Sequence, residues 1–151
     1  MPRLLLLVGL AVLIGCDTFG PDDALPRTNA GATDVASLRG VDTWVAVSAV
    51  SDGDVVRFPD SLFTATFSAE GTVSGRTSAN RYGGDYSARD GGALEVGSLV
   101  TTLVGETDER VRLSVALLRE LSEAERFEVA DGELTVRAAD GDGVRFRAGG
   151  R

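Results

Sequence analysis

The chain has 151 residues and a formal net charge of −8, and all 15 of its basic side chains are arginine because it contains neither lysine nor histidine. The lack of histidine and the single cysteine exclude histidine general-base catalysis, Ser-His-Asp and Cys-His nucleophile systems, and zinc sites built from His and Cys ligands. The negative charge argues against a nucleic-acid partner, since lysine and arginine neutralise the phosphates in such complexes.

The amino-terminal end has the pattern of an export signal. Arg3 precedes an apolar run over Leu4–Ile14, which only Gly9 interrupts. This run is too short to cross a hydrocarbon layer about 30 Å thick, which takes about 20 helical residues. We therefore predict that residues 1–15 are a signal peptide that is removed. A buried strand over the same run is the alternative.

Cys16 ends the tetrapeptide Leu13-Ile14-Gly15-Cys16, which resembles the lipobox of bacterial lipoproteins. In those proteins the cysteine receives diacylglycerol and becomes the new amino terminus. A lone cysteine in an exported protein would otherwise be an unpaired thiol, and two or more acyl chains hold a protein stably on a membrane. The resemblance implies a lipoprotein anchored to a membrane of the cell envelope, on the periplasmic or extracellular side. An accidental match within an ordinary secretory signal is the alternative.

Residues 16–40 are predicted to be the acylated cysteine and a flexible tether, because Pro21, Pro26 and several Gly, Asp and Thr residues stand there and large apolar residues are few. A tether of about 24 residues reaches about 25–30 Å from the membrane. Asp17 resembles the inner-membrane retention signal of some enterobacterial lipoproteins. Because that rule does not transfer reliably among phyla, the choice between inner and outer membrane stays open.

Residues 41–151 are long enough for one domain and have the pattern of antiparallel strands, with short apolar or alternating runs separated by Gly and Asp turns. Asp131-Gly132 and Asp140-Gly141 are turn dipeptides of the closing hairpins. The predicted strands are residues 44–50, 55–58, 62–67, 72–75, 94–96, 99–104, 127–129, 134–136 and 144–146.

One segment has helical periodicity, with Arg112 and Arg119 opposite its apolar stripe. The stripe consists of Leu113, Leu117, Leu118, Leu121 and Ala124. Thr107 or Asp108 can cap the start of this helix, and the leucine face requires a sheet to pack on. The sequence therefore predicts an α+β fold, a strongly curved antiparallel sheet of about six to eight strands with one amphipathic helix packed on it.

The elements follow one another in a characteristic order: Trp44, Phe63–Phe67, Gly71-Thr72-Val73-Ser74-Gly75, Asn80-Arg81-Tyr82-Gly83-Gly84-Asp85-Tyr86, Thr101-Thr102, the helix and the hairpin over 127–136. This order resembles that of the META/HslJ-like domain family, which comprises small exported or envelope domains of bacteria. The resemblance implies a non-enzymatic domain of the cell envelope, with links to envelope stress and secretion but without a defined mechanism.

The chain departs from this family at two positions. The family commonly has a Gly-Cys-Asn turn where this chain has Ser78-Ala79-Asn80, and often a second cysteine where Gly105 stands. Loss of both together is expected if the two cysteines are structural neighbours. With Cys16 as its one cysteine, this chain forms no internal disulfide.

A dense cluster of polar and aromatic side chains, Asn80, Arg81, Tyr82, Asp85 and Tyr86, is the candidate ligand or partner site. A surface loop with such groups can hold a ligand or a peptide. The structural alternative is favoured: Gly83-Gly84 permits a tight turn, the tyrosine rings are buried, and Arg81 pairs with Asp85.

Two runs of aspartate and glycine, Asp52-Gly53-Asp54 and Asp140-Gly141-Asp142-Gly143, suggest calcium, because close carboxylates supply hard oxygen ligands. Neither run continues into an EF-hand loop, so hairpin turns are the favoured interpretation. We predict no metal site and no cofactor.

Three arginines, Arg137, Arg145 and Arg147, alternate with apolar residues on the closing strands and are predicted to face solvent. Solvated side chains are the favoured interpretation. A basic stripe that faces lipid headgroups or an acidic partner is the alternative.

Three functions remain open. The first is a non-enzymatic envelope lipoprotein, bound to the membrane through acylated Cys16, that binds an envelope protein or lipid. The second is a carrier with an apolar cavity between sheet and helix, lined by Phe63, Phe67, Leu117 and Leu121. The third, a hydrolase, requires two carboxyl groups in one cleft about 5 to 9.5 Å apart.

Overall fold

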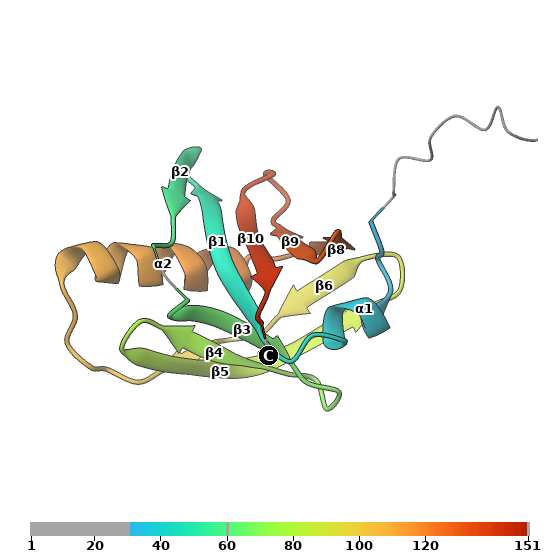
Figure 1. Cartoon of the computed structure of the whole chain (residues 1–151), viewed down its shortest axis with the longest axis horizontal. Helices are drawn as coiled ribbons and strands as arrows, with labels where there is room; N and C mark the ends of the chain where they lie inside the picture. Colours follow the sequence, from blue (N-terminus) through green and yellow to red (C-terminus); the bar gives the residue numbers. More distant parts are fainter. Residues whose placement is uncertain (1–30, 60, 151) are drawn as a thin grey trace, which may run out of the picture.

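The computed structural model describes residues 31–59 and 61–150. The predicted signal peptide, Cys16 and the first part of the predicted tether lie outside the described residues. Two helices and ten strands make up the described part (Figure 1). They are α1 (Val35–Arg39), β1 (Trp44–Ser51), β2 (Asp54–Arg57), β3 (Phe63–Phe67), β4 (Thr72–Thr77), β5 (Asn80–Arg89), β6 (Ala93–Val96), β7 (Val100–Thr101), α2 (Asp108–Ser122), β8 (Arg126–Ala130), β9 (Glu133–Arg137) and β10 (Gly143–Ala148).

The strands form one antiparallel sheet that closes on itself. The order β10-β9-β8-β6-β5-β4-β3-β1, together with pairing of β1 to β10, makes an eight-stranded barrel. Strand β2 extends from β1 as a hairpin, and β7 pairs with β5. The predicted α+β class and curved antiparallel sheet are confirmed. The described sheet is nevertheless a barrel, and it has ten strands rather than six to eight.

Strand β1 makes the closure possible because it has three partners along its length. Trp44 and Val45 pair with β3, residues 48–51 pair with β2, and β10 runs along most of the strand. The register with β10 shifts between Ala46 and Ser48, and such a bulge bends a strand and increases its twist. The end of β1 thus carries the β1–β2 hairpin outward from the barrel wall (Figure 1).

Alternating side chains fill the barrel with an apolar core. In β3, Phe63, Ala65 and Phe67 are buried and the residues between them are partly exposed. Phe67 meets Tyr86 edge to face with ring centroids 5.1 Å apart, and Phe58 packs on Phe63 at 4.9 Å. The predicted strand over residues 62–67 is confirmed as β3.

Two hairpins turn at aspartate-glycine pairs. Asp52 and Gly53 have φ of 52° and 77°, and Asp131 and Gly132 have φ of 51° and 78°. Two successive residues with positive φ make a type I′ turn, which matches the twist of the flanking strands. The hairpin interpretation of these acidic turns is confirmed.

The glycine-rich segment over residues 76–85, which includes the expected tight turn at Gly83-Gly84, forms strands instead of a loop. Most of it belongs to β4 and β5, and the turn between them lies at Ser78, which has φ of 64°. Gly84 serves close packing instead, because a Cβ there would lie 2.5 Å from the carbonyl oxygen of Ser98. The predicted strand over 99–104 is also shorter, because it pairs as β7 over two residues.

The domain begins before residue 41. Leu38 is fully buried, and its carbonyl accepts a hydrogen bond of 3.0 Å from the indole Nε1–H of Trp44. Asp34 caps α1, and Ala32 forms an antiparallel bridge with Val129. Residues 31–40, predicted as part of the tether, therefore belong to the fold because Leu38 completes the core.

Helix α2 packs on the sheet, and it begins after Thr107, one of the two predicted caps. The Thr107 hydroxyl caps it by accepting from the Arg110 N–H, and the helix contacts β1, β2, β4, β6, β9 and β10. Val111 and Val115 stay exposed. Its buried leucines are Leu113, Leu117 and Leu121. Among the described helices, none is long and apolar enough to span a membrane.

Candidate functional site

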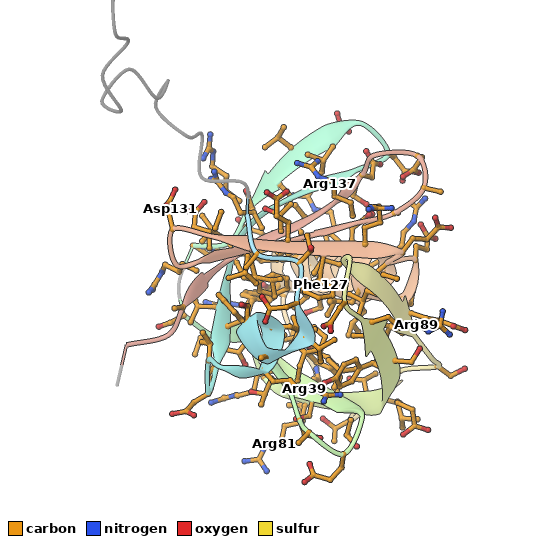
Figure 2. The ribbon with its side chains drawn as sticks, turned by 90° about the vertical axis from the view of Figure 1, so that its right-hand side faces the viewer. Arg39, Arg81, Arg89, Phe127, Asp131 and Arg137 are labelled. Carbon is orange, nitrogen blue, oxygen red and sulfur yellow. The ribbon has the colours of Figure 1, made fainter. Side chains whose placement is uncertain are left out.

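The five residues of the predicted ligand loop lie on strand β5, whose side chains alternate between the two faces of the sheet. Asn80, Tyr82 and Tyr86 are buried, while Arg81 and Asp85 are exposed. Figure 2 shows Arg81 pointing away from the barrel. Within residues 31–59 and 61–150 no ion pair joins Arg81 to Asp85. The five residues thus form no common surface.

Asn80 holds the loop before α2 against the β4–β5 turn. Its Oδ1 accepts hydrogen bonds from the Val104 N–H (2.6 Å) and the Thr102 hydroxyl (3.1 Å). Its Nδ2 donates to the Val104 carbonyl (3.0 Å) and to Glu106 Oε2 (3.3 Å). The amide therefore has its bonding capacity used inside the protein, which supports the structural interpretation of this residue.

Glu106 extends the same contact. Its Oε1 accepts from the Ala79 N–H at 2.7 Å, and its Oε2 accepts from the Ser114 hydroxyl at 3.2 Å. Burial by itself raises the pKa of Glu106, but hydrogen bonds from Ala79, Ser78, Asn80 and Ser114 lower it below the usual value. This carboxylate is fixed in its charged form by the fold.

The two tyrosines bind neighbouring backbone. The Tyr82 hydroxyl donates to the Thr64 carbonyl at 2.8 Å, and the Tyr86 hydroxyl donates to the Ser68 carbonyl at 2.6 Å. Burial raises the pKa of Tyr82. Arg39 Nε donates to the Tyr86 hydroxyl at 2.7 Å, so this ring also anchors the end of α1.

A different surface exposes apolar side chains to solvent. It is the groove between α2 and the β1–β2 hairpin, with a volume of about 700 Å³. Val55, Val111 and Val115 line it and are 66%, 45% and 58% exposed. The other strongly exposed apolar side chains, Val100, Leu103 and Val104, line none of these hollows. The groove therefore combines concave shape with exposed apolar surface, the signature of a binding surface.

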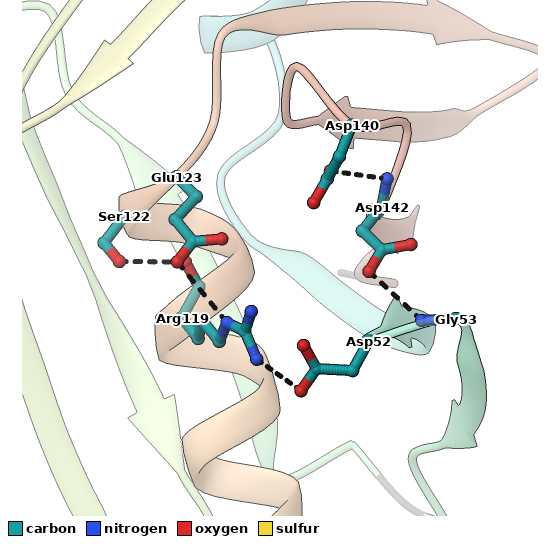
Figure 3. Close-up of polar contacts among 7 residues, drawn as sticks. All are labelled: Asp52, Gly53, Arg119, Ser122, Glu123, Asp140 and Asp142. Carbon is teal, nitrogen blue, oxygen red and sulfur yellow. Dashed lines mark hydrogen bonds and ion pairs between the residues drawn. The ribbon is translucent and has the colours of Figure 1, made fainter.

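One end of the groove is fixed by an ion pair (Figure 3). Arg119 on α2 contacts the carboxylate of Asp52 in the β1–β2 turn and also bonds Glu123 at 3.4 Å. The hydrogen bond and charge of Arg119 lower the pKa of Asp52. Asp142 accepts from the Gly53 N–H at 3.3 Å, so this turn also contacts the β9–β10 turn.

The acidic side chains near these turns do not form a metal site or a buried catalytic pair. Within the described ranges, no group of three or more acidic or cysteine side chains converges to hold a metal ion. A hollow of about 430 Å³ is lined by Glu95, Glu123, Glu125 and Asp140, all exposed. These four acids face solvent and form no buried pair, so this hollow gives no observation that favours the hydrolase hypothesis.

Glu120 is the buried acid that the sequence analysis does not single out. It is 1% exposed, and neither carboxyl oxygen has a hydrogen-bond partner of normal geometry. Burial raises its pKa, and the nearby Ser51 hydroxyl offsets only part of this effect. The sequence does contain a signal for the burial of Glu120, because position 120 follows Leu117 by three residues and lies inside the apolar stripe of the helix.

A model of the META domain matches residues 36–149. The chain belongs to the META domain family. Among solved structures it is similar to the NMR structure of a protein from Burkholderia xenovorans, with a TM-score of 0.65, 24% identity, and 87% of this chain and 98% of that chain covered. It is also similar to the crystal structure of a DUF4847 family protein from Bacteroides vulgatus, with a TM-score of 0.56, 14% identity, and 78% and 99% covered. These likenesses show the fold alone. No curated protein matches the chain.

The META domain brings together the two positions at which the family resemblance placed cysteines. Ala79 and Gly105 line one surface hollow, together with Glu106. The expectation that the two positions are neighbours agrees with this geometry, in which the Ala79 N–H bonds the side chain that follows Gly105.

The four residues predicted to line a lipid cavity do not do so in this META domain. Phe63, Phe67, Leu117 and Leu121 are all buried in one contiguous core cluster. None of the described hollows includes them. The prediction is wrong for these residues because closure of the barrel packs sheet and helix against each other.

Proposed function

We propose that the chain is a lipoprotein of the bacterial cell envelope whose META domain is a non-catalytic binding module. In this proposal acylated Cys16 anchors the protein to the membrane, and the groove between α2 and β2 takes an extended segment of a partner protein. The family is not known as an enzyme family. The observation that carries the proposal is the apolar lining of the groove, Val55, Val111 and Val115.

An extended segment is the favoured occupant because β2 is an edge strand. Among the described residues its strand partner is β1, with Ser51 opposite Asp54 and Ala49 opposite Val56. In an antiparallel hairpin with a two-residue turn, these are the pairs that exchange backbone hydrogen bonds. The backbone N–H and C=O of Val55 and Arg57 therefore point to the free edge, where an added strand can bond them.

The side chains suit an amphipathic segment. Val115 and Val111 on α2 and Val55 on β2 offer apolar contacts, and charged side chains such as Arg112 and Glu109 line the same groove. A bound strand alternates its side chains, so apolar residues contact the valines and polar residues remain in solvent. A role under envelope stress, which the family resemblance implies, is part of this proposal.

Cross-linking tests the binding site. A photoreactive residue at position 115 of the full chain in its native membranes should give a discrete protein adduct. The Val55→Asp substitution should remove the adduct, because it places a carboxylate among the three exposed valines of the groove. The matched substitution Leu103→Asp, at a side chain that is 95% exposed outside the groove, should leave it unchanged. An adduct that ignores Val55→Asp, or that is lost equally with Leu103→Asp, contradicts the groove as the site.

The anchor is tested separately. Intact-mass analysis of protein purified from its own membranes should show acyl chains on Cys16 that are absent from a Cys16→Ser variant. An unmodified mature chain would contradict the lipoprotein assignment while leaving the groove proposal to its own test.

A further inference from the structure

The outer face of the barrel wall beside the β1–β2 hairpin carries a second hollow, which we term the arginine cleft. It has a volume of about 290 Å³, and its lining includes Arg57, Arg137 and Arg145 with Ser48 and Thr135. Its lining residues include no aspartate or glutamate, although the chain has 23 acidic and 15 basic side chains. The cleft is thus locally cationic on an acidic protein.

The strand register places these groups side by side. Ser48 on β1 stands opposite Arg57 on β2 and opposite Arg145 on β10, and Arg145 stands opposite Thr135 on β9. Directly opposed residues share a face of the sheet, so these four make one row. Arg137 lies two residues after Thr135 on the same face, diagonal to Arg145.

The guanidinium groups remain free to bind a ligand. In the part of the chain that the structure describes, Arg57 and Arg137 have no ion pair or side-chain hydrogen bond, and Arg145 reaches Glu133 only at 3.9 Å with both side chains 47% exposed. In contrast, Arg119 is bound to Asp52 and Glu123.

A glycine with closely packed backbone lies beside the arginines on β10. Gly143 stands opposite Arg137 on β9 and opposite Val50 on β1, so this row has no side chain at its centre. A Cβ at Gly143 would lie 2.0 Å from the Val136 carbonyl oxygen, which means that no other residue fits without a backbone shift. Gly143 is also one of the residues that line the cleft.

We propose that the arginine cleft binds a phosphate group, a site beyond the protein-binding role proposed above. Guanidinium groups donate paired, charge-assisted hydrogen bonds to phosphate oxygens, and the Ser48 and Thr135 hydroxyls add neutral donors. The volume suits one small anionic group rather than a long polymer. The phosphate is carried either by a lipid headgroup, which an anchored protein meets at the membrane surface, or by a small soluble compound.

The test uses the full mature chain with Cys16→Ser, so that the acyl anchor contributes nothing to vesicle binding. One arm measures co-flotation with phosphatidylcholine vesicles that contain phosphatidylglycerol, against phosphatidylcholine alone. The other arm measures binding of inorganic phosphate and glycerol phosphate by calorimetry. Each arm compares Arg137→Gln/Arg145→Gln with Arg81→Gln/Arg89→Gln, which removes the same charge from exposed positions on β5; Figure 2 labels three of these four arginines.

We expect binding in one of the two arms, and the arm identifies the source of the phosphate. The Arg137→Gln/Arg145→Gln variant should lose about tenfold or more in affinity, and the Arg81→Gln/Arg89→Gln variant should stay within about twofold. Absence of binding in both arms overturns the proposal. Equal weakening by the two variants also overturns it, since net charge alone would then explain the attraction.

Discussion

Around Asn80 the polar groups bind one another, whereas around the β1–β2 hairpin valines and arginines face solvent. Asn80 alone makes four hydrogen bonds within the protein. On the hairpin, Val55 is 66% exposed and the guanidinium of Arg57 has no partner in the described residues. A cluster of chemically versatile residues is therefore not evidence of a binding site when the fold already uses their hydrogen bonds.

The largest expected effect on stability comes from Asn80, whose hydrogen bonds lie inside the protein. Asn80→Ala removes both groups that hold Val104 and leaves the partners without their bonds. We expect the free energy of unfolding, measured by urea denaturation, to fall by about 2–4 kcal/mol. Asp85→Ala, on the exposed face of the same strand, should change it by about 0.5 kcal/mol or less. Similar losses in the two variants would show that Asn80 has no special structural role.

A smaller effect concerns the buried acid beneath the hairpin. The raised pKa of Glu120 means that the folded protein holds a proton at a pH where the unfolded chain has released it. This stabilising contribution is complete below the ordinary glutamate pKa of about 4.3 and is lost as pH rises through the raised value. Glu120→Gln should remove that loss and raise stability at neutral pH by about 1–2 kcal/mol.

Urea titrations of Glu120→Gln and of the unmodified protein from pH 4 to pH 8 measure this difference. The two stability curves should diverge as pH rises. Parallel curves would show that folding does not raise the pKa of Glu120, and a variant that is less stable at neutral pH would show that the charged carboxylate stabilises the fold. Glu123→Gln, one turn along at an exposed position, is the matched control.

The smallest expected effect concerns the local stability of the β1–β2 hairpin. Asp52→Asn removes the charge that pairs with Arg119 but keeps the type I′ turn, since asparagine also tolerates positive φ. Exposed ion pairs contribute little to global stability, so the urea midpoint should stay nearly constant. Hydrogen exchange of the β2 amides should nevertheless become faster, while exchange in β5 stays unchanged. Unchanged exchange in β2 would mean that the β1 pairing alone fixes the hairpin.

Local patterns in the sequence predict much of this fold. The alternation in Phe63–Phe67, the Asp-Gly turns and the leucine stripe of α2 each follow from side-chain periodicity or turn chemistry, and all agree with the structure. Barrel closure does not follow, because it depends on the pairing of β1 with β10 across most of the chain and on the bulge near Ser48. Non-local pairings leave no local signal.

The candidate site was harder to predict for a related reason. Gly83 and Gly84 suggest a loop over residues 80–86, but both lie in β5, and Gly84 allows the backbone at Ser98 to approach closely, which only the structure reveals. The sequence does indicate part of the groove. Val111 and Val115 fall outside the leucine stripe, so they must face either solvent or a partner. Their meeting with Val55 depends on the fold of the hairpin.

Hydrogen exchange of the protein in its native membranes, compared with the same protein purified in detergent, tests most directly whether the hairpin side is the binding side. The account predicts slower exchange in native membranes over residues 54–57 and 109–116, with no change over residues 80–89. Protection gained over 80–89 with none at the hairpin would contradict it, and so would identical exchange of the two preparations throughout.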